Sequence, residues 1–169
     1  MSFEKRKTKA EQKVLVGSYF RTALDAAHAW SAAAGTATAQ DGLERAGMLF
    51  VKTMKDPKTK EKYHYYSISK TLVGKKDGVF WQFISLYLKT ILCSILGNRG
   101  AAFMHTHPSG SGYGASNADR FLLYLPQIPT SFIYDVKRDS VFEDTKAAGV
   151  TWLEAFSDML KNPNGTPRK

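Results

Sequence analysis

The spacing of hydrophobic and polar residues along the chain separates segments of helical period from segments of strand period. Helical spacing predicts helices over residues 18–34, 79–96, 116–124 and 150–160. Short apolar or alternating runs rich in β-branched and aromatic side chains predict strands over residues 46–51, 62–71, 101–106, 131–136 and 140–144. The small, polar residues between positions 35 and 42 predict a loop after the first helix.

The order of these elements places single strands or pairs of strands between single helices. A mixed β-sheet with helices packed against it satisfies this order, so we expect an α/β or α+β fold. The 169 residues suffice for one hydrophobic core, and no internal repeat or linker divides them. We therefore expect a basic N-terminal lead over residues 1–17, a single domain over residues 18–161 and a flexible tail over residues 162–169.

The longest apolar run, residues 79–96, is close in length to a membrane-spanning helix. More polar positions recur within it at intervals of three or four residues: Gln82, Ser85, Lys89 and Cys93. This spacing marks one face of a helix, and a lysine at mid-span would be costly in lipid. We therefore expect a largely buried helix and no membrane span. The N-terminus is polar and basic and lacks the apolar segment of a secretory signal.

The chain carries 24 lysines and arginines against 15 acidic residues, a net charge of +9. Such an excess favours acidic partners, which include nucleic acid, anionic membranes and acidic proteins. Part of it lies between residues 52 and 62, where lysines flank a turn at Asp56 and Pro57. Solvated lysines on a hairpin explain this cluster more simply than a nucleic-acid surface does, so nucleic acid is not the favoured partner. The single cysteine, Cys93, excludes an internal disulfide and is typical of a reducing, cytoplasmic setting.

Two histidines near a hydroxyl and a carboxylate form the most distinctive motif. His105 and His107 follow a strand-like run, and residues two apart in a strand point to the same side, so both imidazoles can face one point. Asp119, near the start of the next predicted helix, can supply a third ligand. Three protein ligands and an open position are typical of a catalytic zinc site. Taken separately, these residues are two ordinary histidines and, with Ser116, the cap and first-turn acid of a helix.

Together with Glu44, which precedes the first predicted strand, these residues resemble the JAMM motif of the JAB/MPN metalloenzymes. That motif is a glutamate before an early strand, then His-x-His-Pro, then Ser-x-x-Asp, and this chain has Glu44, residues 105–108 and residues 116–119 in the same order. The resemblance implies a cytidine-deaminase-like JAB/MPN fold, with a mixed sheet flanked by helices.

The resemblance also implies a role for each matched residue. His105, His107 and Asp119 would bind zinc (Zn2+). Glu44 would be the general acid/base that exchanges a proton with the attacking water and the leaving nitrogen. Ser116 would help to stabilise the oxyanion of the tetrahedral intermediate.

One spacing differs from the family pattern. Eleven residues, Pro108 to Ala118, separate His107 from Asp119, where the family usually has ten. The additional residue falls in the glycine- and serine-rich segment 109–115, where an insertion costs little. This loop and the alanine-rich N-terminal helix resemble the bacterial JAB-like domains at the C-terminal ends of Rhs-type polymorphic toxins. That resemblance implies secretion without a signal peptide into a target cell, and a cognate acidic immunity protein.

The favoured hypothesis is therefore a zinc-dependent hydrolase of amide bonds, a peptidase or isopeptidase that acts on a protein or peptide, and in one version a bacterial effector toxin. Two alternatives remain open. A non-enzymatic MPN-type scaffold is less favoured because such proteins usually lose metal ligands, and here none is missing. A nucleic-acid-associated protein of the RadC branch is suggested by the basic charge and by the opening of the histidine motif.

Overall fold

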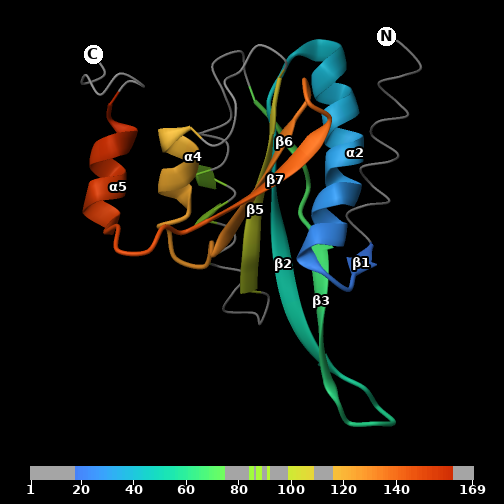
Figure 1. The fold of residues 1–169 in the computed structure, drawn as a ribbon. Coiled ribbons are helices and arrows are strands. Elements are labelled where there is room, and N and C mark those ends of the chain that lie inside the picture. Colours follow the sequence, from blue (N-terminus) through green and yellow to red (C-terminus); the bar gives the residue numbers. More distant parts are fainter. Residues whose placement is uncertain are drawn as a thin grey trace.

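The computed structural model describes residues 18–74, 84–85, 87–88, 91, 99–108 and 116–161. The expected basic lead and flexible tail lie outside the described residues. The elements follow in the order β1 (Tyr19–Phe20), α2 (Ala23–Asp41), β2 (Arg45–Lys55), β3 (Lys62–Ile68), β4 (Leu72–Val73), β5 (Arg99–His107), α4 (Asn117–Leu122), β6 (Thr130–Asp135), β7 (Ser140–Thr145) and α5 (Trp152–Met159) (Figure 1).

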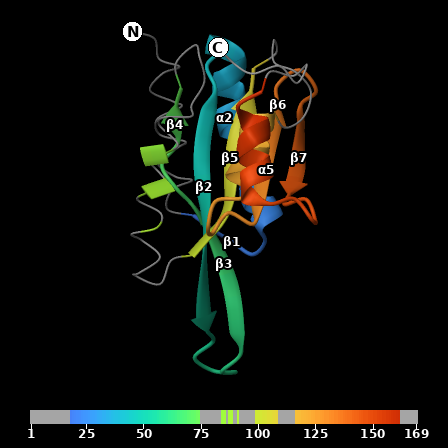
Figure 2. The same cartoon turned by 90° about the vertical axis from the view of Figure 1, so that its left-hand side faces the viewer.

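A single mixed sheet organises these elements, as the sequence predicted. Its strand order is β1-β3-β2-β5-β6-β7, and β4 pairs with the start of β2. The β5–β6 pair is parallel, whereas the other pairs are antiparallel. Helix α2 lies on one side of the sheet, and α4 and α5 lie on the other (Figures 1 and 2). The expected arrangement of helices against a mixed sheet is therefore confirmed.

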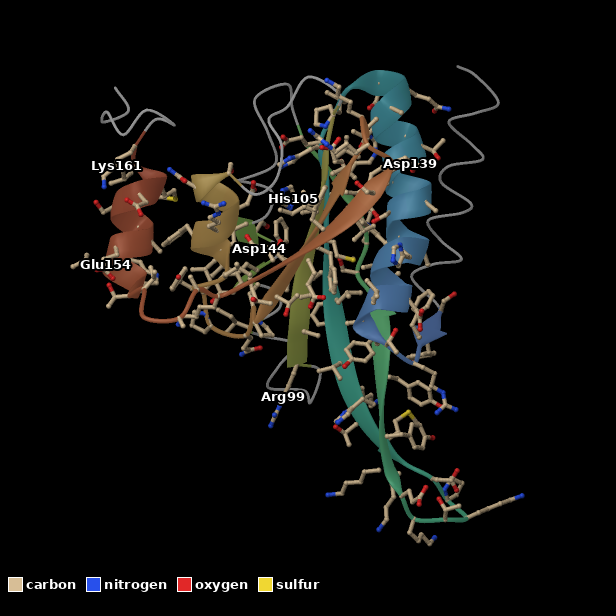
Figure 3. All side chains as sticks on the ribbon, viewed as in Figure 1. Arg99, His105, Asp139, Asp144, Glu154 and Lys161 are labelled. Atoms are coloured by element: carbon tan, nitrogen blue, oxygen red, sulfur yellow. The ribbon has the colours of Figure 1, made fainter. Side chains whose placement is uncertain are left out.

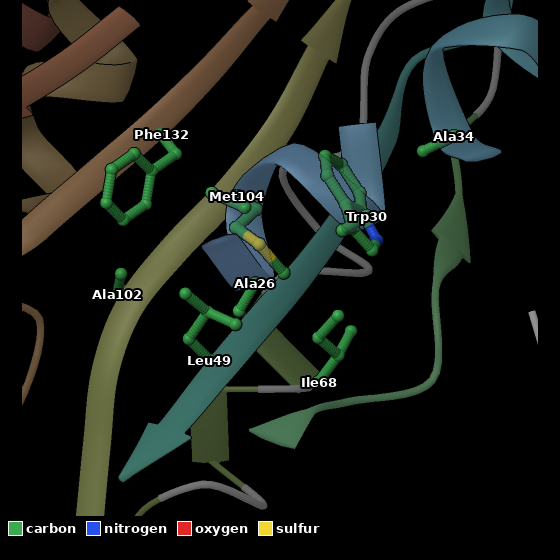
Figure 4. Close-up of a cluster of buried hydrophobic side chains, with 9 residues drawn as sticks. Ala26, Trp30, Ala34, Leu49, Ile68, Ala102, Met104 and Phe132 are labelled. Atoms are coloured by element: carbon green, nitrogen blue, oxygen red, sulfur yellow. The ribbon is translucent and has the colours of Figure 1, made fainter. Parts of the chain in front are cut away.

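The core has two parts, one on each face of the sheet. On the α2 face, buried Trp30 packs against residues of the central strands, among them Leu49 and Met104 (Figure 4). The indole Nε1 of Trp30 donates a 3.0 Å hydrogen bond to the Thr71 hydroxyl, which satisfies its buried polar atom. On the opposite face, the buried cluster consists of Ala46, Met48, Tyr87, Phe103, Leu122, Leu123 and Ile128. The central strands β2 and β5 are thus covered on both faces.

The predicted loop over residues 35–42 is wrong, because α2 continues to Asp41. The helix begins after Thr22, whose side chain accepts a hydrogen bond from the Asp25 N–H, and it ends at Gly42, which adopts a left-handed conformation with φ 68°. Gly35 packs against the sheet, where a methyl group in its place would overlap the ring of Tyr134. Small size here reflects tertiary packing rather than a loop.

The five predicted strands occur in the expected order, but their limits differ. Strand β1 (Tyr19–Phe20) was missed, because the sequence predicted a helix from residue 18, whereas α2 begins only at Ala23. β2 continues to Lys55, and β3 ends at Ile68. The short strand β4, which was not predicted, follows β3 and pairs with Arg45 and Ala46. β5 is longer than predicted at both ends and includes His107.

The predicted helix over residues 79–96 falls mainly outside the described residues. The described positions within it, 84, 85, 87, 88 and 91, are helical, and Tyr87 is buried in the core. Among helices in the described part of the chain, none has the length and apolar character needed to cross a membrane.

Candidate metal centre

The two histidines lie at the end of β5, inside the sheet. β2 pairs with one side of β5 and β6 with the other, so the backbone of this strand is held on both edges. His105 is 2% exposed and His107 is 7% exposed. Their Nε2 atoms are 2.9 Å apart, as the two-residue period of a strand predicts. The ring of His105 also stacks on Phe103, with centroids 5.1 Å apart, which fixes its orientation.

The carboxylate of Asp119 meets both imidazoles. Its Oδ1 lies 3.1 Å from Nε2 of His105, and its Oδ2 lies 3.4 Å from Nε2 of His107. The donor atoms of these three residues all lie within 4.8 Å of one another. They form a candidate metal-binding triad in which β5 supplies two ligands and α4 supplies one.

A capping box at the start of α4 orients Asp119. The Ser116 Oγ accepts a 3.2 Å hydrogen bond from the Asp119 N–H, and the Asp119 carboxylate accepts a 2.7 Å bond from the Ser116 N–H. The Asp119 carboxylate therefore accepts one hydrogen bond from the N-cap residue of its own helix, and both of its oxygens also lie near the histidines. The same Ser-x-x-Asp spacing caps the helix and positions the third ligand.

The surroundings of Asp119 favour its charged form. Burial by itself raises the pKa of this carboxyl, but the charge interaction with His105 and the hydrogen bonds from His105, His107 and Ser116 outweigh it and hold the pKa well below its usual range. The side chain is 14% exposed, so these interactions are only weakly screened. Asp119 therefore offers an anionic oxygen to the candidate metal site near neutral pH.

Ser116 and Glu44, the predicted catalytic residues, are placed differently. Ser116 is an exposed residue beside the triad, and its hydroxyl oxygen serves as the helix cap. Glu44 is half-buried and directly precedes β2, and it is not part of the triad. The pairing of β2 with β5 is observed as far as Ala46 and His105; continued by two residues, this register would place Glu44 opposite His107. The Glu44 carbonyl accepts a 2.8 Å hydrogen bond from Gly74, which holds its backbone.

The carboxylate of Glu44 forms no hydrogen bond or ion pair among the described residues. A half-buried carboxylate without a partner is free to interact with a water molecule or a substrate. Glu44 directly precedes Arg45, the first residue of β2, the strand that pairs with β5.

A buried polar network on the other face of β5 was missed by the sequence analysis. The Thr106 hydroxyl lies 2.7 Å from the Thr38 hydroxyl and accepts a 2.9 Å bond from the backbone N–H of Arg45. The Arg45 guanidinium forms a two-pronged ion pair with Asp41, at 2.9 and 2.7 Å. The bond to Arg45, with burial opposing it, lowers the pKa of Asp41. Asp41 ends α2 and Arg45 begins β2, so the i, i+4 rule for helices gave no signal for this ion pair.

This network also fixes the segment that carries Glu44. The Leu43 N–H donates to the Asp41 carboxylate, and the Leu43 carbonyl accepts a 2.9 Å bond from the Arg45 guanidinium. The hydrogen bonds of Leu43 and Arg45 therefore hold the backbone on both sides of Glu44.

No family model matches the chain, and no curated protein matches it either. Interpretation of the site therefore rests on the residues themselves and on their geometry.

Proposed function

We propose that this protein is a zinc-dependent hydrolase of amide bonds with a JAB/MPN-type site. The convergence of His105, His107 and Asp119 supports this most directly. A tetrahedral zinc ion with ligands at about 2.0–2.1 Å separates any two ligand atoms by about 3.3 Å. The three separations here are 2.9, 3.1 and 3.4 Å, so small shifts would bring the donor atoms to that geometry.

The ligand types favour zinc over other metals. Two imidazoles and one carboxylate form a mixed nitrogen and oxygen set, which zinc accepts readily, whereas magnesium and calcium prefer oxygen ligands alone. Three protein ligands leave a fourth position for water or substrate, as in catalytic rather than structural zinc sites. The mixed sheet flanked by helices agrees with a cytidine-deaminase-like JAB/MPN fold.

In this proposal, the chain's own residues carry out the proton transfers. Bound zinc would supply Lewis acidity that polarises the substrate carbonyl and makes water acidic near neutral pH. The Glu44 carboxylate removes the proton of the attacking water and returns it to the leaving nitrogen. The Ser116 hydroxyl proton, which the helix cap does not use, donates to the oxygen that becomes negative. Phe103 orients the His105 ring and Ser116 orients the Asp119 carboxylate, so both proposed ligands are held in fixed positions.

The substrate class follows from the reaction type: a peptide, isopeptide or side-chain amide of a protein. We propose a bacterial effector toxin as one setting, because the sequence of the glycine- and serine-rich loop and of the alanine-rich first helix resembles that of polymorphic-toxin domains. The net charge of +9 suits an acidic immunity protein as the inhibitor in that setting.

Metal content and catalysis test the proposal separately. Purified wild type should contain about one equivalent of zinc by elemental analysis. Glu44→Gln should retain zinc, because Glu44 is not a ligand, whereas His107→Ala should lose most of it. Each variant would then be expressed in bacteria and its effect on host proteins compared by mass spectrometry for cleavage and deamidation. Wild type should alter specific proteins, and Glu44→Gln should alter none.

Three outcomes would contradict the proposal. Less than about half an equivalent of zinc in gently purified wild type would remove the metal centre. Full activity in Glu44→Gln would remove Glu44 as the acid/base. Normal zinc content with identical proteomes for wild type and Glu44→Gln would favour the non-enzymatic scaffold.

A further inference from the structure

The β2–β3 hairpin extends beyond the rest of the sheet as a two-stranded ribbon (Figures 1 and 2). β5 pairs with β2 only as far as Val51, and β1 pairs with β3 only at Tyr66 and Ser67. Residues 52–65 therefore pair only with each other in the described part of the chain; we call them the basic arm. Four residues of β2 lie in the arm, which at about 3.3 Å per residue gives a reach of about 13 Å before the turn.

Positive charge dominates the basic arm. All five of its lysines are exposed: Lys52, Lys55, Lys58, Lys60 and Lys62. Its acidic residues are Asp56 and Glu61, and the Asp56 carboxylate accepts the backbone N–H groups of Lys58 and Thr59 in the turn. None of the ion pairs formed by the described residues includes an arm residue. Five lysines against two carboxylates thus leave the arm with a net charge of +3.

Two of the lysines face each other directly across the ribbon. Lys55 and Lys62 are cross-strand partners, so their side chains emerge on the same face. Like charges directly opposite each other destabilise a pair of strands, whereas opposite charges stabilise it. An external anion near both ammonium groups would convert the repulsion into attraction. The pair is therefore a feature that suits a polyanionic partner.

The opposite face of the arm carries aromatic rings. Tyr63 and Tyr65 meet edge to face at 4.7 Å, and the guanidinium of Arg21 lies 5.7 Å from both ring centroids. Tyr19, on the neighbouring strand, lies 5.9 Å from Tyr65 and is mainly exposed. These contacts stiffen the root of the arm and add a cation to its aromatic face.

We propose that the basic arm binds the phosphate backbone of double-stranded DNA by entering its major groove. A two-stranded ribbon fits this groove, which is about 12 Å wide and 8.5 Å deep, and the arm reaches farther than that depth. Lysines at the tip and on both faces then lie near the phosphates on either side. The major groove of double-stranded RNA is too narrow to admit the ribbon, so DNA is the better partner.

The arm and the metal centre lie at opposite ends of β5. Figure 3 shows Arg99 at the end of this strand nearest the arm and His105 toward the other end. Binding of DNA by the arm would therefore leave the metal-binding triad uncovered, and the two activities can be tested independently.

The test compares two triple variants with equal net charge. In the arm variant, Lys55, Lys58 and Lys62 become glutamine; in the control variant, Lys70, Lys137 and Lys146, which are exposed on other parts of the surface, become glutamine. Binding of full-length protein to a labelled 20-base-pair DNA duplex is measured by fluorescence anisotropy over a range of salt concentrations. Unlabelled duplex RNA and poly-glutamate serve as competitors.

We expect the wild type to bind the duplex with a steep salt dependence. The arm variant should lose at least tenfold in affinity at about 100 mM salt, and its slope of log K against log salt should fall by about 2–3, near 0.9 for each lost phosphate contact. The control variant should stay within about threefold of wild type. His107→Ala should bind DNA normally, and thermal unfolding of the arm variant should be unchanged or shifted upward, since the Lys55–Lys62 repulsion is gone.

Several results would overturn the proposal. Undetectable binding by wild type at low salt would exclude DNA as the partner of the basic arm. Equal losses of DNA affinity in the arm and control variants would show that net charge, and not the position of the lysines in the arm, determines binding. Displacement of DNA by poly-glutamate as efficient as by unlabelled duplex would point to an acidic protein partner in place of DNA.

Discussion

Replacement of Thr106 by valine should destabilise the protein without removing a metal ligand. Thr106 lies between the two histidines on β5 but faces the other way, and it is fully buried. Its hydroxyl accepts the Arg45 N–H and pairs with the Thr38 hydroxyl. Valine has nearly the same shape and no hydroxyl, so the backbone N–H of Arg45 would be left buried without an acceptor.

The magnitude follows from these two bonds. A buried N–H without a partner costs about 1–3 kcal/mol, and the lost hydroxyl pair costs about 1 kcal/mol more. The additional buried methyl group of valine returns about 0.8 kcal/mol. The free energy of unfolding should therefore fall by about 1–3 kcal/mol, which corresponds to roughly 2–4 °C in Tm for each kcal/mol in a protein of this size.

A double-mutant cycle in urea isolates the hydroxyl pair from the general cost of changing a buried residue. Thr106→Val and Thr38→Val should together cost less than the sum of the single variants, by at least about 0.5 kcal/mol. Thr106→Ser keeps the hydroxyl, so the loss from Thr38→Val should be as large in that background as in wild type. Additive losses, within about 0.3 kcal/mol, would show that the network contributes no coupling and would refute the reasoning.

Three further predictions concern the third ligand, the helix packing and the β6–β7 turn. Asp119→Asn retains an oxygen that can cap α4 but removes the anionic ligand, so zinc affinity should fall at least tenfold in a chelator competition while the circular dichroism spectrum is unchanged. Gly35→Ala should destabilise by about 1–3 kcal/mol in urea, because its methyl group overlaps the Tyr134 ring, despite the better helix propensity of alanine. Burial raises the pKa of Asp135, but its hydrogen bonds from Arg138 and nearby N–H groups outweigh this and lower it. The stability that this carboxylate confers is therefore present above its unfolded pKa, about 3.9, and is lost as the pH falls through its lower folded pKa; the stability difference between wild type and Asp135→Asn should shrink over that range.

Local sequence signals predicted the His105–His107–Asp119 part of the candidate metal centre well. Alternation along a strand is sufficient to place His105 and His107 on one face. A serine three residues before Asp119 is a capping signal that needs only the local chain. Residues 35–42 show where such signals fail, because glycine and threonine indicate a loop until the distant partners Tyr134 and Thr106 are known. The length of α2 was decided by tertiary packing, which outweighed local propensity.

The other half of the site depends on how β2 registers with β5. Thr106 and Arg45, 61 positions apart, are joined by a bond that sets this register at the point where β2 begins. A slip of one residue would turn every side chain of β2 to the opposite face, and the continued register would no longer place Glu44 opposite His107. Consecutive residues of β5 thus have two roles. His105 and His107 lie on the candidate metal-binding face, and Thr106 fixes the start of β2, next to the proposed acid/base Glu44. The polar network is therefore as necessary to the proposed chemistry as the ligands, although none of its members reaches the metal-binding face.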